Sequence, residues 1–218
     1  MKTTGNTIFI SGGSAGIGLA MAKKLSKAGN KIIINGRNEE RLQKALAELE
    51  GAVAIQGDLS VEADRIRIAN ELKTNHSDVN IIINNAGAAF AYQLNETTNA
   101  HEKAAIEMNT NYFSVIHFTE LLLPHLTQKE AAAVVNVSSI AVFGSHKMLP
   151  TYGATKAALH SYTMALRQTY EEQPNVQIYE VYPPLVNTEF SAEIGGANGI
   201  QPSEVAEELL LALGKNQF

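Results

Sequence analysis

Short runs of apolar residues alternate along the chain with longer segments in which apolar positions recur every three or four residues. Nearly continuous apolar runs are typical of strands buried on both faces of a parallel sheet, and the longer segments are typical of amphipathic helices. Six strands are therefore predicted, at residues 7–11, 31–35, 52–56, 79–84, 133–137 and 176–181. Helices are predicted at residues 16–29, 38–50, 61–74, 98–128, 150–172 and 202–213, with Asn38 and Pro202 as helix starts.

This alternation predicts right-handed βαβ units that join into one parallel sheet with helices on both faces. The expected fold class is α/β, a Rossmann-type doubly wound sheet of strand order 3-2-1-4-5-6 in a three-layer αβα arrangement. A chain of 218 residues suits one such domain better than two, so residues 1–218 are expected to form a single domain. Residues 187–199 are rich in glycine and irregular, which predicts a loop and a candidate lid.

Composition excludes several classes of function. The formal net charge is −5 and no long run of Lys or Arg is present, so a nucleic-acid partner is not expected. The chain has no cysteine, which excludes disulfides and thiolate catalysis, and its six histidines form no ligand motif, so no metal is assigned. The N-terminus lacks a signal-peptide pattern and the apolar runs are too short to span a bilayer. A soluble cytoplasmic protein with no membrane partner is expected.

The first predicted strand leads into a glycine-rich turn and then a helix. Gly12, Gly16 and Gly18 permit a tight turn and the close approach of a pyrophosphate, which the N–H groups of the helix N-terminus can bind. The spacing differs from the standard G-x-G-x-x-G pattern, and such turns also occur as plain structural punctuation. The position of the turn, in the first βα unit, favours a dinucleotide site.

The end of the second strand bears on which dinucleotide binds. An NAD site usually has an acidic residue there for the ribose 2′-hydroxyl, whereas this chain has Arg37. A guanidinium can bind a 2′-phosphate with two hydrogen bonds, so NADP(H) is expected rather than NAD(H). Asp58, after the third strand, is expected either to contact the adenine or to cap the helix that follows Ser60.

Tyr152 and Lys156 stand four residues apart, which places both side chains on one face of a helix. A free phenol titrates near 10, and a neighbouring ammonium favours the phenolate, so Lys156 is expected to lower the pKa of Tyr152. The pair could thus serve in acid–base chemistry. By itself, the same spacing also suits an ordinary surface pair.

Taken together, these motifs resemble the short-chain dehydrogenase/reductase family, in its compact single-domain branch, from about residue 5 to at least residue 190. Five motifs in the family's order carry the resemblance: Gly12-x-x-x-Gly16-x-Gly18, Asn84-Asn85-Ala86-Gly87, Asn111, Ser139 and Tyr152-x-x-x-Lys156.

The resemblance implies an oxidoreductase that acts on a small carbonyl or secondary alcohol substrate with a nicotinamide cofactor, which Arg37 indicates to be NADP(H). It implies that Tyr152 is the general acid and base, with Lys156 holding the nicotinamide ribose, Ser139 bonding the substrate oxygen and Asn111 anchoring a water. The cofactor contacts that it implies, with those argued above, are Gly12, Ser14, Gly16, Ile17, Gly18, Arg37, Asp58, Leu59, Asn85, Ala86, Gly87, Tyr152, Lys156, Pro183 and Thr188. Ser139 could instead satisfy backbone groups at a strand end, and Asn111 could bond only within its own helix.

Two departures from the family pattern bear on activity. Pro184 stands where the family commonly has glycine, and its fixed φ and missing N–H could alter the backbone near the nicotinamide. The family's seventh strand and C-terminal tail are not found before Phe218. A catalytically idle NADP(H)-binding or sensing protein is therefore the alternative reading, and a sugar-nucleotide epimerase or dehydratase is disfavoured by the close glycine spacing.

The substrate side is expected to be mostly apolar, which favours a hydrophobic or neutral substrate. Its expected residues are 88–92, 140–143, Met148, Leu149, Leu185 and Phe190. The resemblance also implies that the helices predicted at 98–128 and 150–172 pack across a two-fold axis, so a homodimer or homotetramer is expected.

Overall fold

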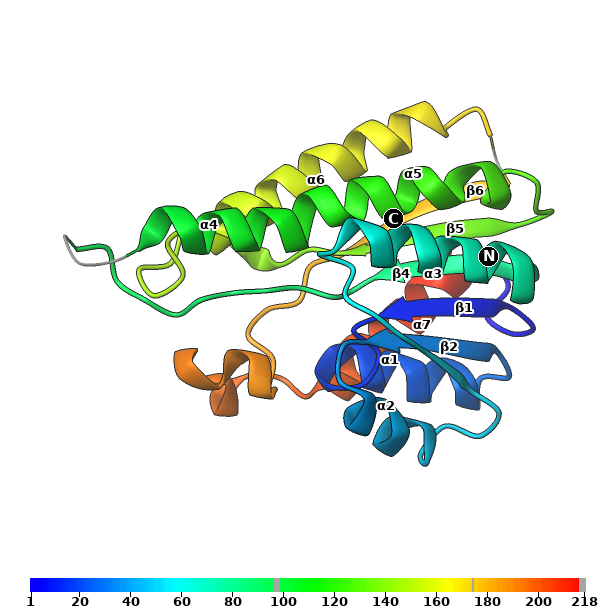
Figure 1. Cartoon of the computed structure of the whole chain (residues 1–218), viewed down its shortest axis with the longest axis horizontal. Coiled ribbons are helices and arrows are strands. Elements are labelled where there is room, and N and C mark those ends of the chain that lie inside the picture. Colours follow the sequence, from blue (N-terminus) through cyan, green and yellow to red (C-terminus); the bar gives the residue numbers. More distant parts are fainter. Residues whose placement is uncertain (96–98, 174, 216–218) are drawn as a thin grey trace.

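A sheet of six parallel strands forms the centre of the computed structural model, which describes residues 1–95, 99–173 and 175–215 (Figure 1). The strand order is β3-β2-β1-β4-β5-β6, as predicted. The strands are β1 Thr7–Ser11, β2 Lys31–Gly36, β3 Val53–Gln56, β4 Val79–Asn84, β5 Ala132–Val137 and β6 Val176–Val181. Every predicted strand is present, and no end differs from its prediction by more than one residue.

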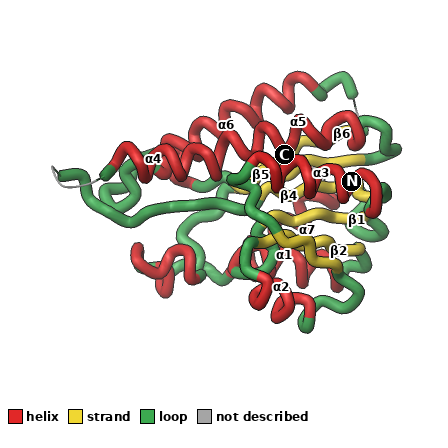
Figure 2. The backbone as a smooth tube through the Cα atoms, viewed as in Figure 1, coloured by secondary structure: helices red, strands yellow, loops and turns green. Residues whose placement is uncertain are grey.

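Helices cover both faces of the sheet (Figure 2). They are α1 Gly16–Lys27, α2 Glu39–Leu46, α3 Glu62–Asn75, α4 Ala100–Met108, α5 Ser114–Leu126, α6 Tyr152–Thr169 and α7 Pro202–Lys215. Asn38 caps α2 as predicted, because its side-chain oxygen accepts a 2.9 Å hydrogen bond from the backbone N of Arg41. Helix α2 is shorter than predicted at its C-terminal end.

Two apolar cores explain why the strand sequences are nearly continuous runs of apolar residues. Ile8 and Ile10 of β1 face the core formed with α1, α2 and α7, whereas Phe9 faces the core formed with α3, α5 and α6. Successive strand side chains point to opposite faces, so a strand buried on both sides needs an apolar residue at each position. Each fully buried Ile or Phe contributes about 1.5–3 kcal/mol.

The helix predicted at 98–128 is interrupted, which corrects that prediction; residue 98 itself lies outside the described part. Helix α4 passes into a π-helical turn, η1 Asn109–Phe113, and only then into α5. A π turn adds one residue to a helical turn and is often found at functional sites. Here it carries Asn111, whose buried side chain bonds to other segments of the chain.

The segment predicted as a loop at 187–199 contains two short 3₁₀ helices, η3 Glu189–Ile194 and η4 Gly196–Asn198. Its ends are joined by hydrogen bonds from Asn187 N to Ile200 O, at 2.8 Å, and from Ile200 N to Leu185 O, at 3.0 Å. Figure 1 shows the segment in orange, standing away from the sheet. Among the described helices, none is both long enough and apolar enough to span a membrane.

Candidate active site

A cleft of about 960 Å³ opens at the carboxyl ends of the strands, where the chain connections from β1 and β4 diverge to opposite sides. This is the place where doubly wound sheets bind ligands. Most of the residues predicted to contact a cofactor line it: Gly12, Gly16, Ile17, Gly18, Asn85, Ala86, Gly87, Tyr152, Lys156, Pro183 and Thr188. Ser14, Arg37, Asp58 and Leu59 do not line this cleft.

The turn after β1 has the geometry of a phosphate cradle. Gly12 has a φ of +63°, and a Cβ there would lie 3.0 Å from Asn85 Nδ2 and 3.1 Å from Ala86 Cα. At Gly18 a Cβ would lie only 2.3 Å from the carbonyl oxygen of Gly12, so only glycine lets α1 come this close to the turn. Ala15 at the N-cap makes no side-chain bond to the first turn of α1, which leaves that turn's N–H groups directed at the cleft without a side-chain cap.

The segment after β4 is bonded to the end of β1. Ser11 Oγ accepts hydrogen bonds from the backbone N of Asn85 and of Ala86, both at 2.9 Å. Asn85 Nδ2 donates to Ser11 O, also at 2.9 Å, and Asn84 Nδ2 donates to Asn136 Oδ1 at 2.8 Å. These bonds hold the two strand ends that flank the cleft in a common position.

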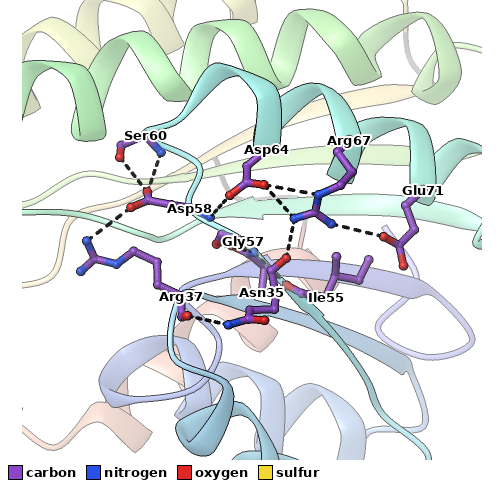
Figure 3. A network of polar contacts seen from close by, with 10 residues as sticks. Asn35, Arg37, Ile55, Gly57, Asp58, Ser60, Asp64, Arg67 and Glu71 are labelled. Carbon is purple, nitrogen blue, oxygen red and sulfur yellow. Dashed lines mark hydrogen bonds and ion pairs between the residues drawn. The ribbon is translucent and has the colours of Figure 1, made fainter.

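Arg37 and Asp58 meet beyond the cleft, at the ends of β2 and β3 (Figure 3). Arg37 Nη1 lies 3.6 Å from Asp58 Oδ2, and the Arg37 side chain is 77% exposed. Asp58 Oδ1 accepts bonds from the backbone N and the Oγ of Ser60, at 2.8 and 2.7 Å. Asp58 thus holds the turn before α3 and does not cap that helix, since the N-cap is Val61, which corrects the capping alternative. Leu59 is buried in the core beside α3.

Tyr152 and Lys156 are buried together in the first turns of α6, so they are not a surface pair. Lys156 Nζ donates to the carbonyl oxygen of Val137 at 2.8 Å and lies 5.7 Å from the centroid of the Tyr152 ring. Burial lowers the pKa of Lys156 to about 8, and the charge of Glu180 partly opposes this shift.

The pKa of Tyr152 departs from its ordinary value in the direction opposite to the expected one. Burial raises it to about 12; a hydrogen bond with Ser139 acts to lower it, and the charge of Glu107 raises it further. The prediction of a lowered pKa in this structure is therefore wrong. The reason is desolvation of the phenol in a site that the helical spacing alone could not show to be buried.

Asn111 and Ser139 complete the group. Asn111 Nδ2 donates to Ala88 O at 2.8 Å and to Thr155 Oγ1 at 2.9 Å, and its Oδ1 accepts from Ala88 N at 2.8 Å. It therefore joins the segment after β4 to α6, and the alternative that it bonds only within its helix is wrong. Ser139 Oγ accepts from Ala141 N at 3.1 Å, so Ser139 both caps a 3₁₀ helix, η2 Ile140–Phe143, and bonds Tyr152.

Apolar side chains form the other wall of the cleft. Of the residues predicted on the substrate side, those that line it are Ile140, Ala141, Phe143, Leu149, Leu185 and Phe190. The ring of Phe190 lies 6.2 Å from that of Tyr152. Residues 88–92, Val142 and Met148 do not line the cleft. In the 88–92 segment, Phe90 N instead donates a 2.8 Å hydrogen bond to Glu107 Oε1 of α4.

Comparison with known proteins agrees with this geometry. The family model for short chain dehydrogenase matches residues 6–198. The chain belongs to the short-chain dehydrogenase family. Its sequence is 34% identical to the uncharacterized oxidoreductase DltE of Bacillus subtilis, over 95% of this chain and 82% of that protein.

Solved structures of the same fold include two from Burkholderia. A short-chain dehydrogenase/reductase from Burkholderia phymatum, in complex with NAD, has a TM-score of 0.91 and 22% identity, over 100% of this chain and 89% of that one. A short-chain dehydrogenase from Burkholderia cenocepacia, in complex with NADP, has a TM-score of 0.86 and 25% identity, over 98% of this chain and 86% of that one.

The cleft of this short-chain dehydrogenase also contains residues that sequence reasoning missed: Ala15, Arg41, Val137, Ser138, Gly144, Ser145, His146, Val186, Glu189, Ser191 and Ile194. The clearest omission is Arg41, whose Nη2 lies 2.9 Å from Glu189 Oε1 and so joins α2 to η3. Its position four residues after Arg37, on the first turn of a helix, was a signal that could have found it. Glu189 lies far away in the sequence, and no local pattern indicated this partner.

The backbone bonds between the segment that follows β6 and the end of β5 are present despite the proline at position 184. Pro183 is buried, and its carbonyl oxygen accepts a 3.1 Å bond from Ile140 N, next to the bond from Ser138 N to Val181 O at 2.8 Å. The peptide bonds here are trans, and Pro184 itself is exposed. Neither of these two bonds to the end of β5 involves the nitrogen of Pro184.

Proposed function

We propose that the protein is an NADP(H)-dependent oxidoreductase that interconverts a carbonyl compound and a secondary alcohol. The observation that carries the proposal is the group formed by Ser139 with the buried Tyr152 and Lys156, which opens on a cleft whose other end is a glycine-rich turn suited to phosphate. A protein that only binds nucleotide has no need of this group, because a serine, a phenol and an ammonium at one point are suited to proton transfer.

The residues present fit a nicotinamide dinucleotide. The turn from Gly12 to Gly18 would hold the pyrophosphate, Asn85 to Gly87 would contact the central part of the molecule, and Lys156 would bind the nicotinamide ribose. The bound cofactor supplies or accepts the hydride, and the protein supplies position and charge.

A preference for NADP(H) is supported by Arg37. The run from Asn35 to Arg37 offers no carboxylate for a ribose 2′-hydroxyl, while the exposed guanidinium can bind a 2′-phosphate. Asp58 is its present partner, at 3.6 Å, and a phosphate would compete for the same guanidinium. The similar Burkholderia structures contain NAD in one case and NADP in the other, so the preference rests on this arginine.

In the reductive direction, Tyr152 donates its phenolic proton to the substrate carbonyl oxygen as the carbonyl carbon is reduced, and the product is an alcohol. The Ser139 hydroxyl, whose single proton is directed to Tyr152 in this structure, turns to donate the second hydrogen bond to that substrate oxygen and stabilises its developing charge. Lys156 places a positive charge beside the phenolate that remains. Asn111 anchors a water through which that proton is replaced from solvent. In the oxidative direction each step is reversed.

The apolar wall favours a hydrophobic or neutral substrate. Phe143 and Phe190 line the cleft and are 75% and 55% exposed, so large apolar surfaces remain open there, and the Phe190 ring lies close to that of Tyr152. Among the described residues, two cationic side chains line the cleft. Lys156 is buried and donates to Val137 O, and Arg41 pairs with Glu189. Neither is placed to anchor a substrate carboxylate on the apolar side.

The test is a panel of ketones, aldehydes and secondary alcohols with NADPH, NADH, NADP and NAD, followed at the nicotinamide absorbance. Turnover is expected with apolar substrates and NADP(H), and Tyr152→Phe is expected to lower kcat about 10²–10⁴-fold while NADPH binding persists. Turnover of Tyr152→Phe within a few-fold of the wild type contradicts the mechanism. Tight NADPH binding without turnover across the panel favours a binding or sensing protein.

A homodimer or homotetramer is proposed through α4, α5 and α6. Ile106 on α4 and Phe113 in η1 are 51% and 55% exposed, so this side of the molecule presents apolar surface. Light scattering is expected to give a mass of twice or four times 23.5 kDa. A mass of a single chain at micromolar concentration contradicts this proposal.

A further inference from the structure

A buried carboxylate lies behind the catalytic group, and the mechanism above does not use it. Glu180, on β6, has no exposed side-chain surface. Its Oε1 accepts a hydrogen bond from Ser138 Oγ, and its Oε2 accepts one from Tyr182 OH at 2.7 Å and lies 2.9 Å from His160 Nδ1. A carboxylate is costly to bury unless it is paired and hydrogen-bonded, and these contacts supply the hydrogen bonds.

Two of these three partners of Glu180 lie on or beside the elements that carry the reacting side chains: Ser138 directly follows β5, and His160 is on α6. Ser138 stands between Val137, whose carbonyl oxygen accepts the bond from Lys156, and Ser139. His160 follows Lys156 by four residues on α6, so Tyr152, Lys156 and His160 share one face of that helix. The Glu180 carboxylate thus contacts both the end of β5 and the face of α6 that carries Tyr152 and Lys156.

The positive charge of Lys156 also requires a compensating negative charge. Lys156 is a buried ammonium whose direct hydrogen bond goes to a neutral carbonyl, and a buried cation needs a compensating charge. Glu180 is the carboxylate that acts on it, because its charge raises the pKa of Lys156 against the effect of burial. Glu107, the other fully buried carboxylate among the described residues, acts on Tyr152.

We propose that Glu180 is a positioning residue of the active site: its buried negative charge compensates the ammonium of Lys156, and its bond to Ser138 fixes the strand end that carries Ser139. This role of Glu180 rests on the proposed function, because it matters for activity only if Lys156 and Ser139 take part in the reaction. Its test needs no turnover, so the two can fail separately.

The experiment follows the titration of Lys156 by NMR in protein labelled with ¹³Cε-lysine, without nucleotide or substrate, with the resonance assigned by Lys156→Met. Glu180→Gln retains the shape of the side chain and removes its charge, so the Lys156 midpoint is expected to fall by about half a pH unit or more. Glu107→Gln is the matched control: the same change at a buried carboxylate that faces Tyr152 is expected to leave the Lys156 midpoint in place.

A Lys156 midpoint within about 0.2 pH units of the wild type in folded Glu180→Gln overturns the inference, as does an equal shift in Glu107→Gln. If Glu180→Gln does not fold, the wild type provides the test. In protein also labelled with ¹³Cδ-glutamate, acid titration of Glu180 must move the Lys156 resonance with the same midpoint, and a Lys156 resonance that stays fixed overturns the inference.

The titratable groups that contact Glu180 are His160 from α6 and Tyr182 after β6. Both are retained in every variant, and Glu180→Gln also removes the charge that helps to raise the pKa of Tyr182. An inactive enzyme with the expected Lys156 shift counts against the proposed function alone. An active enzyme with an unshifted Lys156 counts against the role of Glu180 alone.

Discussion

Lys156 holds its charge inside the protein with 4% of its surface exposed, and this arrangement opposes folding. Burial lowers its pKa from 10.5 to about 8. The unfolded chain therefore binds more protons than the folded one between those two values, and the stability of the fold rises with pH through that window. Below about pH 8 the full cost applies, and it corresponds to about 3 kcal/mol.

Lys156→Met is accordingly expected to stabilise the protein at pH 7 by about 1–2 kcal/mol, the burial cost less the value of the lost bond to Val137 O. The gain is expected to shrink between pH 8 and pH 10.5, where the wild-type lysine becomes neutral. Urea unfolding at pH 7 and pH 10 measures both values. Lys44→Met, at an exposed lysine of α2, is the control and is expected to change stability little at either pH. A Lys156→Met variant less stable than the wild type at pH 7 contradicts the argument.

The Tyr152–Lys156 pair also shows where residue-level reasoning stops. The sequence correctly predicted that the two side chains share a helix face. It did not predict that the face is buried, and burial reverses the expected direction of the pKa of Tyr152. Desolvation depends on what packs around a side chain, which four residues of local sequence cannot specify.

At the scale of elements, the close packing of α1 against the turn that follows β1 depends on one glycine. Gly18 lies inside α1, where alanine is ordinarily favoured over glycine by about 1 kcal/mol. A Cβ there would lie 2.3 Å from Gly12 O, so the helix would have to move away from the turn. The same contact sets the distance between the turn and the helix N-terminus, the two parts of the proposed phosphate site.

Gly18→Ala is therefore expected to destabilise the protein by about 2 kcal/mol or more and to weaken NADPH binding. Gly29→Ala is the control: its φ of +87° strains an alanine, but no atom lies within 4 Å of the new Cβ. It is expected to cost about 1 kcal/mol and to leave NADPH affinity unchanged. Urea unfolding and a fluorescence titration with NADPH measure the two effects. Normal stability and normal affinity in Gly18→Ala would refute the role given to this contact.

The π-helical turn at Asn109–Phe113 is an element that the sequence did not reveal. Its residues continue an ordinary helical pattern, so 98–128 was predicted as a single helix. The turn coincides with the contacts of Asn111 to Ala88 and Thr155, which come from segments distant in the sequence. Partners from distant segments are not visible in a local helical pattern, and π turns are rare enough that such a pattern alone predicts an ordinary helix.

For the whole molecule, nucleotide binding couples to stability, since a ligand that binds only the folded state raises the unfolding temperature. NADP is expected to raise the Tm more than NAD at equal concentration. Arg37→Ala is expected to remove that difference by lowering NADP affinity about 10- to 100-fold, the value of a charge-assisted hydrogen bond to phosphate. Thermal unfolding with each nucleotide measures it.

Arg41→Ala provides the comparison, because Arg41 lies one helical turn further on and pairs with Glu189. It is expected to leave the NADP preference largely intact. If Arg41→Ala removes the preference and Arg37→Ala does not, the 2′-phosphate is bound by Arg41 and the assignment to Arg37 is wrong.

By itself, the sequence determined the six strands, their order, the glycine turn and the residues around Tyr152 and Lys156. These follow from local periodicity, from the handedness of βαβ units and from closely spaced motifs. Only the tertiary structure decided that Tyr152 and Lys156 are buried, that the helix carrying Asn111 is interrupted, that Arg41 pairs with Glu189 and that Glu180 acts on Lys156. Burial and long-range pairing depend on segments far apart in the chain, so they exist only once the layers have packed.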